Sequence, residues 1–101
     1  MNKLISVLRN IKDFTWSDAL FLPEDEVWGT ESKCLVWNPD DIENEEDEVP
    51  KIALENGLMY ALGIQTVMAI VDNYYETHDR ITDNGLVDAF LYYYDNDAFI
   101  K

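Results

Sequence analysis

Cations, cysteine and histidine are scarce in this chain of 101 residues. Seven Lys and Arg residues face 21 Asp and Glu residues, so the formal net charge at pH 7 is -14. This charge disfavours direct binding to nucleic acids or anionic membranes, because their surfaces are also negative. The single cysteine, Cys34, excludes a disulfide within the chain and is typical of a protein in a reducing cytoplasm.

The residue types that usually carry catalysis are almost missing. His78 is the only histidine, and it lies at the end of a predicted helix, where it suits the helix dipole. No glycine-flanked serine indicates a nucleophile, and the four glycines are too scattered for a phosphate-binding loop. Cys34 lies in a predicted strand, where a thiol is typically a small buried hydrophobe. We therefore expect no catalytic residue and no enzymatic activity.

Membrane and metal signals are also missing. No apolar stretch approaches the roughly 20 residues of a membrane-spanning helix. The first ten residues carry apolar side chains at helical spacing, not the continuous apolar centre of a signal peptide. A calcium loop over 38–49 fails because Glu43 stands where a glycine is needed and Val49 where a glutamate is needed. The sequence predicts a cytoplasmic protein with no cofactor, no metal site and no membrane partner.

What the chain does contain is enough apolar material for a core. Hydrophobic residues make up 48% and aromatic residues 13%, which is not the composition of a disordered chain. A length of 101 residues fits one globular domain covering 1–101. We expect an α+β fold: a mainly helical single domain with a small antiparallel sheet from the middle third.

Apolar periodicity and turn residues locate the expected elements. Helices are predicted over 2–12, 64–77 and 83–94, with a short helix following Pro50 and Thr82 as the N-cap of the last one. Strands are predicted at 19–22 and 34–37, and the segment 58–62 fits a helix or a strand equally well. The core-facing side chains expected on the two long helices are Ile64, Val67, Met68, Val71, Tyr74, Tyr75, Leu86, Val87, Phe90, Leu91 and Tyr94.

Two features of the first 40 residues admit two interpretations each. Lys3, Arg9 and Lys12 form a local basic patch on the first helix, which either lies near the run of acidic residues at 40–48 in space or is a solvated face. Trp16, Trp28 and Trp37 either pack in the core, with partners for their indole N–H groups, or lie exposed as interface residues.

The most distinctive stretch is an acidic loop at about 38–50. Seven of the nine residues from 40 to 48 are acidic, namely Asp40, Asp41, Glu43, Glu45, Glu46, Asp47 and Glu48. Such a run either keeps the protein soluble or forms a docking surface for a basic partner. The net charge favours docking, because solubility is usually reached with a net charge of about 2 to 8. Glu24, Asp25 and Glu26 form a second acidic patch, and these ten residues are the predicted partner-binding site.

Three segments resemble a small family of acidic bacterial proteins of about this length. They are Trp-Ser-Asp-Ala-Leu-Phe-Leu-Pro at 16–23, Cys-Leu-Val-Trp-Asn-Pro-Asp-Asp at 34–41 and Tyr-Tyr-Asp-Asn-Asp-Ala-Phe-Ile at 93–100, together with Trp28. In size and charge the chain also resembles immunity proteins of bacterial toxin systems such as contact-dependent growth inhibition. That resemblance implies an immunity protein or antitoxin that binds a basic nuclease toxin, and it assigns no individual residues.

Two other functions fit the same composition. One is a nucleic-acid mimic that inhibits a host DNA-binding enzyme through its acidic surface. The other is a plain protein-interaction adaptor in which charge has no special role. In all three cases we expect a protein partner and no direct contact with nucleic acid.

Overall fold

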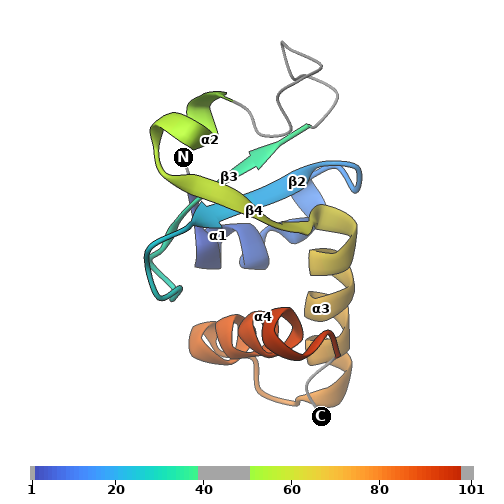
Figure 1. Ribbon diagram of the computed structural model, residues 1–101. Coiled ribbons are helices and arrows are strands. Elements are labelled where there is room, and N and C mark those ends of the chain that lie inside the picture. The colour runs from blue at the N-terminus through green and yellow to red at the C-terminus, as the bar shows by residue number, and fades with distance from the viewer. Residues whose placement is uncertain (1, 39–50, 99–101) are drawn as a thin grey trace.

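The computed structural model describes residues 2–38 and 51–98 (Figure 1). Four strands form one antiparallel sheet in the order β1-β3-β2-β4. The strands are β1 (Asn2–Lys3), β2 (Ala19–Pro23), β3 (Lys33–Trp37) and β4 (Leu58–Gly63). The helices are α1 (Leu4–Arg9), the short 3-10 helix η1 (Ile11–Asp13), α2 (Lys51–Glu55), α3 (Ile64–Thr77) and α4 (Asp83–Asn96).

The central strand, β2, is buried on both faces of the sheet. Leu20 and Leu22 point into the larger core with α1, α3 and α4, whereas Ala19 and Phe21 belong to a smaller cluster with Ala53 of α2. All five residues of β2 are buried, which explains its continuous apolar run. Figure 1 shows the resulting layers, with α2 on one side of the sheet and α1, α3 and α4 on the other.

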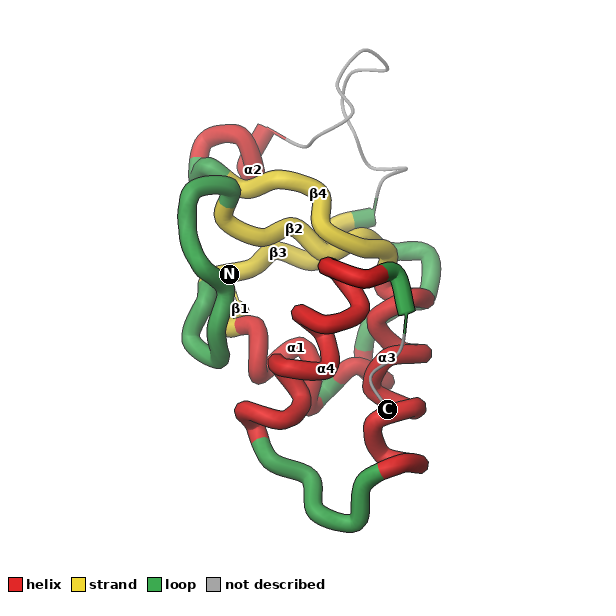
Figure 2. The backbone as a smooth tube through the Cα atoms, turned by 60° about the horizontal axis from the view of Figure 1, so that its bottom comes forward, coloured by secondary structure: helices red, strands yellow, loops and turns green. Residues whose placement is uncertain are grey.

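The larger core is built mainly from leucine, isoleucine and valine of the three helices. Its fully buried side chains include Leu4 and Leu8 of α1, Ile64 of α3, and Leu86 and Phe90 of α4. Figure 2 shows α4 lying beside both α1 and α3, in agreement with the cluster that these helices share. None of the described helices has the length and apolarity that crossing a bilayer requires.

The three cations of the N-terminal segment are all engaged in ion pairs within the protein. Lys3 pairs with Glu31 at 2.7 Å and Lys12 with Asp72 at 3.0 Å. The Arg9 guanidinium lies 2.7 Å from the carboxylate of Asp83. The hydrogen bonds to Glu31 and Asp83 raise the pKa of Lys3 and of Arg9, respectively. The predicted basic patch is therefore neutralised locally by acids from other elements.

The junction between α3 and α4 depends on Tyr74. Its ring stacks on His78 with centroids 4.2 Å apart, and its hydroxyl end lies against Gly85 in the first turn of α4. Thr82 caps α4, because its hydroxyl accepts a hydrogen bond from the Gly85 amide at 3.0 Å. A side chain at Gly85 would occupy the space of the tyrosine ring, so the glycine permits the close contact between the helices.

The α+β class, both long helices and the strands at 19–22 and 34–37 are confirmed. The helix predicted over 2–12 is too long: residues 2 and 3 pair with β3, and a 3-10 turn follows α1. The segment 58–62 is a strand, and the sheet also reaches beyond the middle third of the chain, because β1 and β2 lie in the first third. The predicted burial of Tyr75 is wrong, because 46% of its surface is exposed, and Tyr94 is also partly exposed at 38%, whereas Ile70, which was not predicted, is buried.

Replacing Gly85 with alanine tests the packing between α3 and α4. In an open helical position this change would stabilise the fold by up to about 1 kcal/mol. Here the added Cβ would lie 2.8 Å from Cζ of Tyr74, so we expect a loss of about 1–3 kcal/mol in the free energy of unfolding. Urea unfolding measures the difference.

Gly29→Ala is the matched control, because no atom lies within 4 Å of a Cβ added there. We expect the unfolding free energy of that variant to stay within about 0.5 kcal/mol of the wild type. Equal stability of Gly85→Ala and the wild type would show that Tyr74 does not pack on α4 as described.

Candidate functional site

An acidic turn follows the central strand at one end of the sheet. We use the name acidic turn for Glu24, Asp25 and Glu26, all of which are exposed. Pro23 lacks an amide hydrogen and is the last residue of β2. The Glu24 amide donates a 3.0 Å hydrogen bond to the Gly57 carbonyl, which ties the start of the turn to the residue before β4.

Trp28 holds the far end of the acidic turn in the core. Its indole N–H donates a 2.7 Å hydrogen bond to the Pro23 carbonyl, so the chain closes back on the end of β2. The ring packs on Phe90 and edge-on against Tyr94 of α4, with centroids 6.2 and 4.7 Å away, and is 9% exposed. A large aromatic group with a satisfied N–H is a strong constraint on the backbone on either side of it.

The segment after Trp28 is fixed by the first helix. α1 has no side-chain cap, and its first amides need acceptors from elsewhere. The Leu4 amide donates to the Ser32 carbonyl at 2.8 Å, and the Ile5 amide donates to the Thr30 carbonyl at 3.1 Å. The Ser32 hydroxyl in turn accepts from the Gly29 amide at 2.8 Å. The whole connection from β2 to β3 is thereby bonded to three separate parts of the fold.

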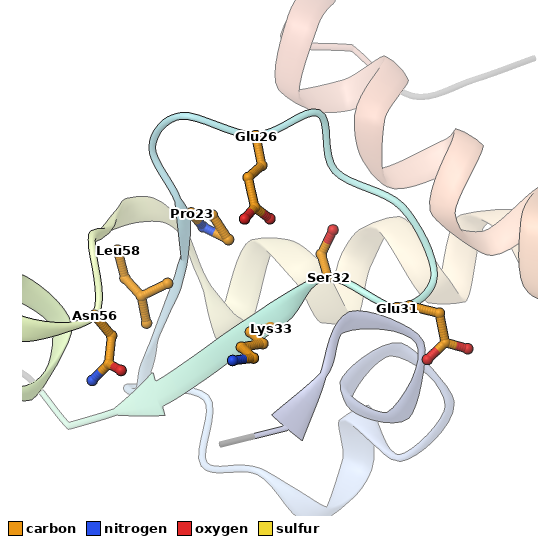
Figure 3. A pocket seen from close by; sticks show the side chains of 7 residues that line it. All are labelled: Pro23, Glu26, Glu31, Ser32, Lys33, Asn56 and Leu58. Atoms are coloured by element: carbon orange, nitrogen blue, oxygen red, sulfur yellow. The ribbon is translucent and has the colours of Figure 1, made fainter.

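A pocket of about 290 Å³ opens beside the acidic turn. Figure 3 shows the Glu26 side chain hanging into it toward Ser32, whereas Glu31 points away. The pocket is lined by Pro23, Glu26, Glu31, Ser32, Lys33, Asn56 and Leu58. Its walls come from the ends of three strands and from the turn between α2 and β4, so it is part of the rigid end of the sheet.

The acidic turn takes no part in the salt bridges found among the described side chains. Among residues 2–38 and 51–98, the salt bridges join Lys3, Arg9 and Lys12 to other acids, and none includes Glu24, Asp25 or Glu26. An exposed apolar residue follows directly, because 96% of the Val27 surface is accessible. Three exposed carboxylates therefore lie beside an exposed valine and a pocket, an arrangement that attracts a cationic group.

The described part of the chain brings together only some of the predicted site residues. Glu24, Asp25 and Glu26 are adjacent and exposed as expected. The other seven predicted residues, Asp40, Asp41, Glu43, Glu45, Glu46, Asp47 and Glu48, lie outside the described residues. No group of three or more His, Cys, Asp or Glu side chains in the described ranges is placed to hold a metal ion.

The three tryptophans have different environments. Trp16 is 65% exposed, Trp28 is buried, and Trp37 is half-buried at the end of β3. The Trp37 indole N–H is buried and has no hydrogen-bond partner among the described residues. The sequence did not indicate that Val27 is exposed, because it precedes the apolar Trp28, and it did not indicate the pocket, whose lining residues come from separate segments.

Comparison with known proteins gives a family and no function. The chain belongs to the family described as Domain of unknown function (DUF7716), whose model matches residues 1–101. No curated protein and no solved structure matches the chain.

Cys34 is a structural residue in β3. Its thiol is completely buried and lies 3.4 Å from the Asn2 carbonyl, to which it donates. Burial raises its pKa from 9.0 to about 12, so the thiolate that reactive cysteines use is absent at neutral pH. Its position next to β1 explains why the only thiol of the chain packs as an apolar group.

The raised pKa predicts a specific loss of stability in alkali. Between about pH 9 and 11 the unfolded chain releases the Cys34 proton and the folded chain retains it. The free energy of unfolding should therefore fall by up to about 1.4 kcal/mol per pH unit from this group. Cys34→Ala lacks the group, so its unfolding free energy should decline less steeply over the same range. Parallel declines in urea titrations of the two proteins would contradict the buried thiol.

Proposed function

We propose that this protein is an inhibitory binding protein of the immunity or antitoxin type, which neutralises a basic nuclease toxin by covering its cationic cleft. The observation that carries the proposal is the acidic turn at one end of the sheet, whose three exposed carboxylates form no salt bridge with the described side chains. A nuclease binds a polyanion through Lys and Arg side chains, and an acidic protein surface can occupy the same side chains.

The charge distribution supports a cationic partner. Apart from the seven acids between 40 and 48, the chain has 14 acidic residues against seven cations. Three of those cations are already paired with acids inside the fold. A field of one sign attracts partners of the opposite sign over several ångströms and speeds their association.

The rigidity of the acidic turn supports tight binding as well as attraction. Association costs free energy when loops and side chains become ordered at an interface. The hydrogen bonds of Glu24, Trp28 and Ser32 place the backbone of the turn before any partner arrives. Less ordering is then required on binding, so more of the contact energy appears as affinity.

Val27 and the pocket supply the apolar and steric part of the surface. Interfaces usually combine a water-excluding centre with a charged rim. Val27 is almost fully exposed directly after the three acids, and the pocket beside it has room for a long side chain next to the Glu26 carboxylate. A lysine or arginine of the toxin would bind at the three exposed carboxylates, because the pocket itself is lined by Lys33 as well as Glu26.

The first experiment is to find and identify the partner. The immobilised protein is exposed to an extract of its source cells at about 50 and 500 mM salt, and the captured proteins are identified by mass spectrometry. The proposal expects a cationic nuclease that is retained at low salt and released at high salt. Purified toxin should then lose nuclease activity on adding an equimolar amount of the protein. A captured nuclease that remains fully active would contradict the proposal.

Neutralising the acidic turn should slow complex formation. The triple variant Glu24→Gln, Asp25→Asn, Glu26→Gln is expected to reduce the association rate constant about tenfold at low salt, with a smaller change in dissociation. Stopped-flow fluorescence measures both rates. Replacing Glu45, Glu46, Asp47 and Glu48 in the same way measures the contribution of the acidic run.

A matched control separates local charge from total charge. Glu76→Gln, Asp79→Asn, Asp88→Asn removes the same three charges from exposed acids on and beside α3 and α4. We expect association to slow by no more than about twofold, because screening limits the reach of distant charges. An equal effect of the two triple variants would show that the acidic turn is not at the interface.

A further inference from the structure

The pocket beside the acidic turn has charges of both signs on its walls. Glu26 comes from the loop that follows β2, and Lys33 is the first residue of β3 (Figure 3). Both residues are exposed, and no salt bridge among the described side chains includes either of them. The two groups therefore line one pocket of about 290 Å³ without neutralising each other across it.

Lys33 also lies next to a second cation. It is directly opposite Lys3 of β1, and opposite residues of an antiparallel pair project to the same face of the sheet. Like charges in that arrangement destabilise the pair. The ammonium group of Lys3 is paired with Glu31 at 2.7 Å, whereas Lys33 has no such partner among the described residues. An anionic group bound at Lys33 would offset the repulsion.

The apolar part of the pocket lining comes from the sheet. Pro23 and Leu58 are opposite each other in β2 and β4, and both are buried. On another wall, the Ser32 hydroxyl accepts a hydrogen bond from the Gly29 amide at 2.8 Å, so its own hydrogen is left to donate to a ligand. The pocket thus combines a carboxylate, an ammonium group and a hydroxyl donor with an apolar wall.

We propose that this pocket binds a free α-amino acid with an apolar side chain. The ammonium group of the ligand would meet the Glu26 carboxylate, and its carboxylate would meet the Lys33 ammonium group and the Ser32 hydroxyl. The side chain would then lie against Pro23 and Leu58. The volume of about 290 Å³ is near the lower limit of the roughly 300 to 1,000 Å³ typical of ligand pockets, which fits a molecule of this size.

The two charges select a zwitterion over ions of one sign. A simple cation would be attracted by Glu26 and repelled by Lys33, and a simple anion would meet the reverse. In a chain with a formal net charge of -14, an anion is also repelled by the protein as a whole. An amino acid has no net charge at neutral pH, so the contacts inside the pocket decide whether it binds.

Binding should be weak and should depend little on salt. Exposed ion pairs contribute modestly, so we expect a dissociation constant of about 1 to 10 mM for leucine. Raising the salt from about 50 to 500 mM should change this constant by less than about threefold, because leucine carries no net charge. The proposed toxin would be released over the same range of salt. The amino-acid site and the toxin interface can therefore fail independently of each other.

Nuclear magnetic resonance of the nitrogen-15-labelled full chain tests the proposal. Titration with L-leucine up to about 50 mM should shift the amide signals of Glu26, Ser32 and Lys33 to saturation. Two probes keep the leucine side chain but lack one charge: isoamylamine has only the ammonium group, and isocaproate has only the carboxylate. Each should bind at least about fivefold more weakly than leucine, because one of the two ion pairs is lost.

Matched variants locate the contacts. Glu26→Gln and Lys33→Gln should each weaken leucine binding at least about fivefold. Glu24→Gln removes a neighbouring exposed carboxylate that does not line the pocket, so leucine binding should stay within about twofold of the wild type. The absence of saturable shifts, equal binding of leucine and either probe, or unchanged binding in the Glu26 and Lys33 variants would overturn the proposal. The same spectra show whether each variant is folded.

Discussion

The hydrogen bond from the Trp28 indole to the Pro23 carbonyl is the contact on which the candidate site depends. It closes the chain around Glu24, Asp25 and Glu26 while the ring packs on Phe90 and Tyr94 of α4. A short acidic loop would otherwise extend and move, because its carboxylates repel one another. With Trp28 in the core, the same three charges occupy a fixed position at the end of the sheet.

Among the described side chains, no salt bridge compensates those charges. The cations of the N-terminal segment, Lys3, Arg9 and Lys12, pair with acids of other elements. Such exposed pairs contribute little to stability, typically less than about 1 kcal/mol each. Their larger effect is on the surface charge. They neutralise three of the seven cations, and the acidic turn remains available to a partner.

Interactions between residues close in the sequence could be predicted, whereas pairing between distant segments could not. The Thr82 cap and the helix after it follow from residues within one turn of each other. Residues 58–62 are apolar without a clear period, and pairing with β2 decides that they form a strand. Nothing near Trp28 indicates its burial, because the rings that cover it lie more than 60 residues later. The acids at 24–26 were predicted from charge alone. The hydrogen bonds that fix the backbone of this turn could not be predicted, because their partners lie elsewhere in the fold.

The most direct test of this account is the mobility of the acidic turn in the free protein. Nitrogen-15 relaxation gives an order parameter for each backbone amide on the picosecond to nanosecond scale. If Trp28 fixes the turn, residues 24 to 27 should have values near about 0.85, as in β2, and lower values in Trp28→Ala. Values below about 0.6 in the wild type would mean that the turn is flexible and that its charges are not held in place for a partner.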